Sequence, residues 1–161
     1  MKRIVFLTVF GIGLLMAGSC KETTTKVIKT APITFKKEGM LTIFKAETDT
    51  VLVSIDIEIA ESTYETETGL MYRKGMEIKQ GMLFILDVRQ HYFHMKNTEF
   101  PLDIIFIKDD LTIGSFQKNT KPFDETSLPS NIPVKYALEV NAGLSEKWAL
   151  KVGDKIEFVK Q

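Results

Sequence analysis

The sequence has few of the residues that build disulfides and metal centres: one cysteine and two histidines among 161 residues. A single cysteine excludes an intramolecular disulfide and a cysteine-rich zinc site. Two histidines leave little room for a histidine-based centre, so we expect no metal and no other cofactor. The charges balance, at 21 Lys and Arg against 21 Asp and Glu. Because domains that bind nucleic acid normally carry a basic excess, we expect no nucleic-acid partner.

Long apolar runs are also scarce, and the clearest one lies at the start of the chain. The basic residues Lys2 and Arg3 precede an uncharged apolar run over residues 4–16. A helix of that length spans about 20 Å at ~1.5 Å per residue, which is short of the ~30 Å hydrocarbon core of a bilayer. The run is therefore typical of a signal peptide rather than of a membrane span.

The next residues, 17–20 (AGSC), resemble the lipobox of bacterial lipoproteins. In such proteins the thiol is acylated, with palmitate among the acyl groups, so Cys20 is the expected lipidation site; the alternative is an ordinary signal with a chance cysteine. We expect a signal peptide at 1–19, a lipidated flexible tether at 20–38 and one domain at 39–161. Since Asp after the cysteine favours inner-membrane retention and Lys21 is not Asp, we expect the outer membrane, facing the periplasm.

The mature chain consists mainly of segments typical of short strands. Strict alternation over residues 51–59 predicts a half-buried strand, joined by a loop at 47–50 to a strand at 40–46. Ser62 and Glu65 fit a capping box that opens a helix running to about Tyr72. Further strands are expected at 82–86, 91–96, 104–107, 112–116, 136–140 and 155–159, with a turn at 87–90 and a second helix at 145–150.

Prolines at positions 122, 129 and 133 predict a long loop over residues 118–134, of the kind that often binds ligands. No βαβ alternation is evident. The predicted fold class is therefore α+β and β-rich, with about eight short strands and two short helices. A barrel-like sheet is expected because closure removes exposed strand edges.

Several blocks of the chain resemble the bacterial and archaeal domain-of-unknown-function family 192. They cover about residues 50–159 and lie at 69–73 (GLMYR), 81–84 (GMLF), 95–98 (MKNT) leading to 101–107 (PLDIIFI), 138–143 (LEVNAG) and 152–154 (VGD). The resemblance implies an N-terminal signal in many members but no activity. Relatives usually carry Trp or another aromatic residue where this chain has His94, which would change the polarity of a groove wall if that position lines one.

The first candidate ligand site is the polar stretch at residues 95–103. Lys96 supplies a cation, Asn97 a donor and an acceptor, and Asp103 a carboxylate. If Pro101 fixes the turn, these groups converge beside the 118–134 loop. The alternative is that Asn97 and Thr98 satisfy turn backbone while Lys96 and Asp103 form an ion pair.

The second candidate pair is Arg73 and Glu139. On a predicted strand, Leu138 and Val140 point one way and Glu139 points the other, which favours exposure to solvent. Exposure at the mouth of a groove would suit ligand binding equally well.

Paired carboxylates and paired histidines are two further patterns in the sequence. Asp103 with Asp124 or Glu139 would form the two-carboxylate arrangement of a glycoside hydrolase. His91 and His94 lie three residues apart on a predicted strand, so they should point to opposite faces and not share a metal ion.

These observations favour a lipid-anchored, non-enzymatic envelope protein that binds a small polar ligand, a glycan or an envelope protein. A hydrolase acting on envelope saccharides through paired carboxylates is the alternative. A purely structural role is the third reading.

Overall fold

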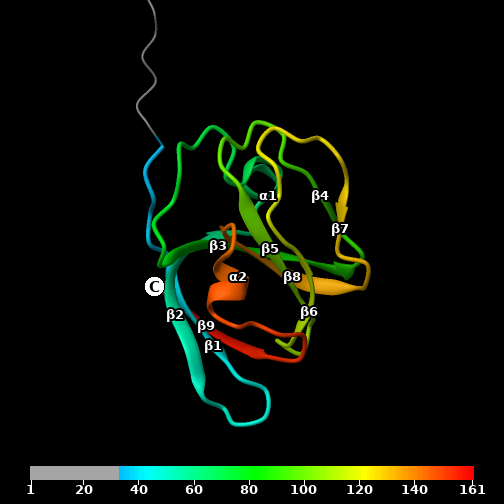
Figure 1. Ribbon diagram of the computed structural model, residues 1–161. Coiled ribbons are helices and arrows are strands. Elements are labelled where there is room, and N and C mark those ends of the chain that lie inside the picture. Colours follow the sequence, from blue (N-terminus) through cyan, green and yellow to red (C-terminus); the bar gives the residue numbers. More distant parts are fainter. Residues whose placement is uncertain (1–32) are drawn as a thin grey trace, which may run out of the picture. The chain divides into compact units, whose positions relative to one another are not determined.

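The computed structural model describes residues 33–161, so the expected signal peptide, Cys20 and most of the expected tether lie outside the described residues. The described part contains nine strands and two short helices (Figure 1). The strands are β1 (Gly39–Phe44), β2 (Val51–Ala60), β3 (Gln80–Arg89), β4 (Tyr92–Phe93), β5 (Leu102–Ile107), β6 (Ile113–Gln117), β7 (Leu128–Pro129), β8 (Val134–Asn141) and β9 (Lys155–Lys160). The helices are α1 (Thr63–Thr68) and α2 (Leu144–Lys147).

Seven strands form one mixed sheet in the order β6-β5-β8-β3-β2-β1-β9, and β4 pairs with β7 in a separate ribbon. All neighbours in the large sheet are antiparallel except β2 and β3, which run parallel. The segment between these two strands contains α1, so the chain does contain a β-α-β crossover that was not expected from its sequence. The two ends of the sheet touch through an isolated bridge between Thr112 and Lys155, and a closed barrel is not found among the described residues.

The hairpin of β1 and β2 confirms the expected pairing, with Leu41 opposite Ile55 and Ile43 opposite Val53. These four side chains are buried. Alternation therefore places the β-branched residues of β2 inward, as the period of two predicts.

Helix α1 begins as predicted but is shorter than predicted. Glu65 N donates to Ser62 Oγ at 3.3 Å, and Ser62 N donates to the Glu65 carboxylate at 2.9 Å, which completes the capping box. The helix ends before Gly69, whose φ of 49° and ψ of −128° are accessible essentially to glycine alone. The predicted end near Tyr72 is therefore wrong.

The region after β3 also differs from the prediction. Strand β3 continues to Arg89, where it pairs with Val134 of β8, so the predicted turn at 87–90 is wrong. The predicted strand at 91–96 shrinks to β4, which pairs with β7 of the proline-containing loop through Tyr92 and Pro129. Proline is compatible with this position because a two-stranded ribbon is all edge.

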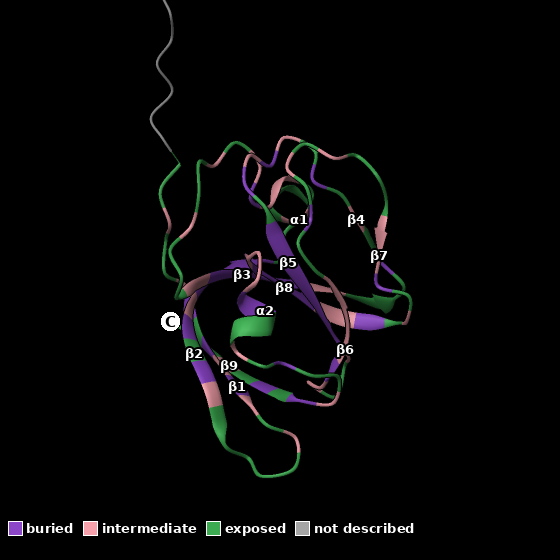
Figure 2. Cartoon of the chain, viewed as in Figure 1, coloured by how far each residue is buried: buried purple, intermediate pink, exposed green. Residues whose placement is uncertain are grey.

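Both faces of the central strands are covered (Figure 2). An inner cluster on the side of α2 includes Leu138, Val140 and Leu144, and an outer cluster on the side of α1 includes Phe84 and Phe106. Residues 33–161 thus hold their own hydrophobic core, which is what an independently folding domain requires. No helix within 33–161 is long and apolar enough to span a membrane.

Candidate ligand groove

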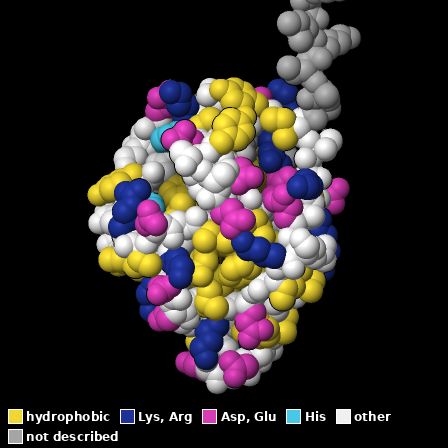
Figure 3. Space-filling view, turned by 180° about the vertical axis from the view of Figure 1, so that it is seen from behind, with side chains coloured by type: hydrophobic (Ala, Val, Ile, Leu, Met, Phe, Trp, Pro, Cys, Tyr) yellow, Lys and Arg dark blue, Asp and Glu magenta, His cyan; other side chains and the backbone are white. Residues whose placement is uncertain are grey.

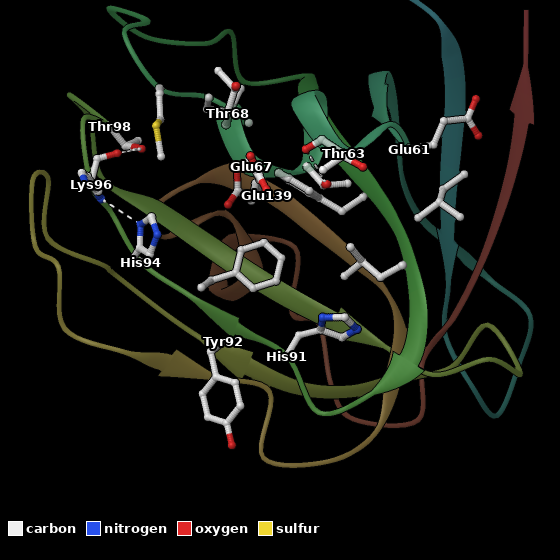
Figure 4. Close-up of a pocket in the computed structure, with 18 of the residues that line it drawn as sticks. Glu61, Thr63, Glu67, Thr68, His91, Tyr92, His94, Lys96, Thr98 and Glu139 are labelled. Atoms are coloured by element: carbon white, nitrogen blue, oxygen red, sulfur yellow. Dashed lines mark hydrogen bonds between the residues drawn. The ribbon is translucent and has the colours of Figure 1, made fainter.

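A groove of about 1270 Å³ opens on the outer side of the sheet (Figure 4). Its walls are α1 with the following turn, the end of β3, and the segment from His91 to Thr98 that contains β4. Glu139 reaches it from β8. Among the residues predicted as a site, the groove brings together Lys96, Asn97 and Glu139 but not Arg73 or Asp103.

Glu139 is the most unusual side chain of the groove. It points away from Leu138 and Val140 as predicted, but it is only 6% exposed. The expected exposure is wrong because β8 lies between β5 and β3 and the crossover through α1 covers that face. Burial raises the pKa of the Glu139 carboxyl to about 8, against a smaller lowering by the Arg73 guanidinium. No residue of the described chain donates a hydrogen bond to this carboxyl.

Arg73 lies behind the groove and is engaged elsewhere. Its guanidinium forms an ion pair with Glu58 of β2 at 2.5 Å, and both side chains are largely buried, at 12% and 7% exposed. The Lys36 backbone N–H donates to the other Glu58 oxygen at 2.7 Å. Arg73 therefore neutralises Glu58. Its positive charge lowers the pKa of Glu139 only through space, because the two side chains form no ion pair.

Asp103 is fully buried and holds backbone together. One carboxylate oxygen accepts from Asn119 N at 2.8 Å, and the other accepts from Ser145 N, in the first turn of α2, at 2.9 Å. Asp103 thus fixes the start of the proline-containing loop and the start of α2. The alternative ion pair with Lys96 is wrong, because both oxygens of Asp103 are taken by these N–H groups.

Asn97 joins the two rims of the groove. Its backbone has a φ of 54°, its side-chain amide donates to Tyr72 Oη at 2.8 Å, and its carbonyl accepts from Tyr72 N at 2.8 Å. Lys96 lies exposed beside it. The backbone N–H of Lys96 donates to Nδ1 of His94 at 3.3 Å (Figure 4).

Both histidines line the groove, so the expectation that they point to opposite faces is wrong. The prediction assumed strand alternation over residues 91–96, but only the two residues of β4 in this stretch form a strand. His91 is buried, with Nε2 2.7 Å from the carbonyl oxygen of Asp87, whereas His94 lies exposed on the groove wall. Across residues 33–161, no three His, Cys, Asp or Glu side chains are grouped to hold a metal ion.

The carboxylate pair proposed from Asp103 and Asp124 does not form. Asp103 is enclosed, and the half-buried Asp124 accepts from the backbone N–H of Thr126 at 2.8 Å. Besides Glu139, the carboxylates that line the groove are Glu61, Glu67 and Asp87; of these, Glu67 lies on α1, and the sequence did not point to it. The spacing of Thr63, Thr66 and Glu67 puts them on one side of α1, so helical periodicity was the signal that could have found it.

Residues 42–158 match the model of domain-of-unknown-function family 192 (DUF192), described as "Uncharacterized ACR". The chain belongs to this family. The match confirms the resemblance seen in the sequence blocks.

Two proteins of known structure are 34% identical in sequence to this chain. One is a protein of unknown function from Novosphingobium aromaticivorans DSM 12444, with a TM-score of 0.69, covering 73% of this chain and 83% of the other. The second is a Sinorhizobium meliloti 1021 protein assigned provisionally as a transcription regulator, with a TM-score of 0.71. The match covers 80% of this chain and 98% of that protein. Among curated proteins, none matches the chain.

Proposed function

We propose that this DUF192 protein is a lipid-anchored, non-enzymatic binding or accessory domain of the cell envelope. Acylated Cys20 anchors it to the outer membrane, and the domain faces the periplasm. Its groove under α1 binds a small polar ligand, with saccharides of the envelope included in that class.

The observation that carries this proposal is the state of Glu139. A buried polar group without a hydrogen-bond partner costs roughly 1–3 kcal/mol, so folded proteins seldom retain one. The Glu139 side chain is buried and accepts no hydrogen bond from the described residues, and it lies in the wall of an open groove. A bound ligand that donates to this carboxyl would recover the cost.

A thermal-shift screen of residues 33–161 tests ligand binding. The compounds are envelope glycan fragments, small amines and small anions, each tested on the wild type, on Glu139→Gln and on Glu146→Gln, whose exposed side chain on α2 lies outside the groove. A ligand at a hundred times its Kd adds about 2.7 kcal/mol, or roughly 8 °C for a domain of this size. Stabilisation of the wild type and Glu146→Gln but not of Glu139→Gln supports the proposal. Equal stabilisation of all three places the ligand outside the groove and contradicts it.

Membrane anchoring is tested separately in cells that produce the full chain. We expect the wild type in the outer-membrane fraction and Cys20→Ser outside it, since two or more acyl chains are needed for stable attachment. Membrane association of Cys20→Ser equal to that of the wild type would contradict lipid anchoring through this residue.

A hydrolase acting on envelope saccharides is the second candidate, and one observation favours it. Glu139, with its raised pKa, and the exposed Glu67 line the same groove, and glycoside hydrolases use two carboxyl groups of which one has a raised pKa. Turnover of an envelope saccharide that is lost in both Glu139→Gln and Glu67→Gln would replace the binding proposal with this one.

The provisional assignment of the Sinorhizobium relative as a transcription regulator describes that protein, and our proposal does not include nucleic acid among the ligands of this chain. On the face in Figure 3, Lys and Arg side chains are interspersed with Asp and Glu. A domain that binds nucleic acid normally gathers its basic side chains on one face or stripe.

A further inference from the structure

The fold supplies donors to its other buried acidic side chains but not to Glu139. The described domain buries four acidic residues: Glu58, Asp103, Glu139 and Asp154. Asp103 and Asp154 each accept from two backbone N–H groups, and Glu58 accepts from one and pairs with Arg73. Glu139 alone has neither. Since each of the other three has a donor or a cation within the protein, the partner of Glu139 is expected from outside it.

We infer that this partner is an organic cation, and that the groove is a site for a ligand whose ammonium group forms an ion pair with the carboxylate of Glu139. This inference rests on the proposed binding function and names the chemical class of the ligand. Charged donors make hydrogen bonds about twice as strong as neutral ones, so an ammonium group offsets the desolvation of a buried carboxylate best.

Charge balance in the groove supports a cation. Besides Glu139, the charged and histidine side chains that line it are Glu61, Glu67 from α1, Asp87 and Arg89 from β3, and His91, His94 and Lys96 from the β4 segment. Glu61 forms an ion pair with Lys160 at 2.6 Å, and the other two carboxylates are balanced by Arg89 and Lys96. Behind the groove, Arg73 is cancelled by Glu58. The ionised carboxylate of Glu139 is then the uncompensated charge of the site.

Gly69 lies close to this carboxyl. A Cβ at position 69 would lie 3.0 Å from Cζ of Phe84 and 4.0 Å from Oε2 of Glu139, so the aromatic ring and the carboxyl both border the glycine. The ring keeps the local dielectric constant low, which strengthens an ion pair formed there. Figure 4 shows α1 carrying Thr63 and Glu67 over the part of the groove where Glu139 lies, while Lys96 and His94 lie toward its other end.

Binding of a cation must also release a proton. At pH 7 a carboxyl with a pKa of about 8 is roughly 90% protonated, and it ionises when the ammonium group binds. The measurement is isothermal titration calorimetry of residues 33–161 at pH 7 in phosphate and in MOPS, which differ in ionisation enthalpy and contain no primary ammonium group. The probes are amines and their alcohol counterparts: benzylamine and benzyl alcohol, cadaverine and its diol, and glucamine and sorbitol.

We expect at least one amine to bind ten times more tightly than its alcohol and to release about 0.9 proton per site, as follows from the pKa of about 8. Glu139→Gln should lose the proton release and at least tenfold in affinity, whereas Glu146→Gln should keep both. Alcohols that bind as tightly as amines without proton release would overturn the cation and leave the binding groove standing. Absence of binding by every amine at millimolar concentration would also overturn it, and the glycan screen would still test the groove.

Discussion

Replacing Glu139 with Gln should stabilise the domain at neutral pH, although it changes a side chain of the core. Glutamine keeps the shape and the hydrogen-bonding groups of a protonated glutamate but cannot ionise. The unfolded chain releases the Glu139 proton around the ordinary pKa of 4.5, whereas the folded chain retains it until about pH 8. Folding therefore becomes less favourable for the wild type as the pH rises through this window, and the variant escapes this loss.

The size of the effect follows from these two pKa values. The loss accumulates at ~1.4 kcal/mol per pH unit above pH 4.5, which makes the variant more stable by about 3 kcal/mol at pH 7. Above about pH 8 the folded wild type also ionises and the difference becomes constant. Below pH 4.5 the ionisation of Glu139 no longer affects folding, so the free energies of unfolding should differ only by what replacing a carboxyl with an amide contributes.

Urea unfolding of residues 33–161 at several pH values measures this difference, with Trp148, the chain's one tryptophan, as the fluorescent probe. Trp148 packs against the inner cluster and so reports on the core. Glu146→Gln is the matched control and should follow the wild type at every pH. Parallel stability curves for Glu139→Gln and the wild type between pH 4.5 and pH 8 would refute the reasoning.

Three further predictions concern residues outside the groove. Asp103→Asn should lower the free energy of unfolding in urea by about 3 kcal/mol, because an amide cannot accept from both N–H groups. Its affinity for amines, measured by calorimetry, should stay within twofold of the wild type, and a large loss of affinity would mean that the residue acts at the site. Ser62→Ala should cost about 1 kcal/mol in the same urea assay by removing the helix cap, and an unchanged stability would show that α1 is held by packing alone. Arg73→Met should cost about 3–5 kcal/mol by leaving a buried charge unpaired, and adding Glu58→Met should recover most of that loss; equal instability of the single and double variants would contradict the ion-pair account.

Local patterns predicted the local structure well. The alternation in β2 and the capping box of Ser62 and Glu65 depend on residues near one another in the chain, and both are confirmed. The helix end was misjudged because the conformation of Gly69 decides it, and a glycine within a helical stretch does not reveal which backbone angles it adopts.

The candidate site was only partly predictable because it depends on the order of strands. The direction of Glu139 relative to Leu138 followed from alternation, but its burial depends on β8 lying centrally and on the α1 crossover covering that face. Likewise, the composition of residues 95–103 indicated a polar cluster. It did not show that the backbone N–H groups of Asn119 and Ser145, from two distant segments, would bind the Asp103 carboxylate. Periodicity within a strand does not specify what covers its second face.

The central claim is that the fold leaves Glu139 without a donor in the wall of a groove. Carbon-13 NMR titration of its side-chain carboxyl in residues 33–161, assigned by comparison with Glu139→Gln, tests this most directly. The account predicts a titration midpoint near pH 8 in the free domain. A midpoint near the ordinary value of 4.5 would show a solvated or hydrogen-bonded carboxylate and would contradict the assignment of the groove.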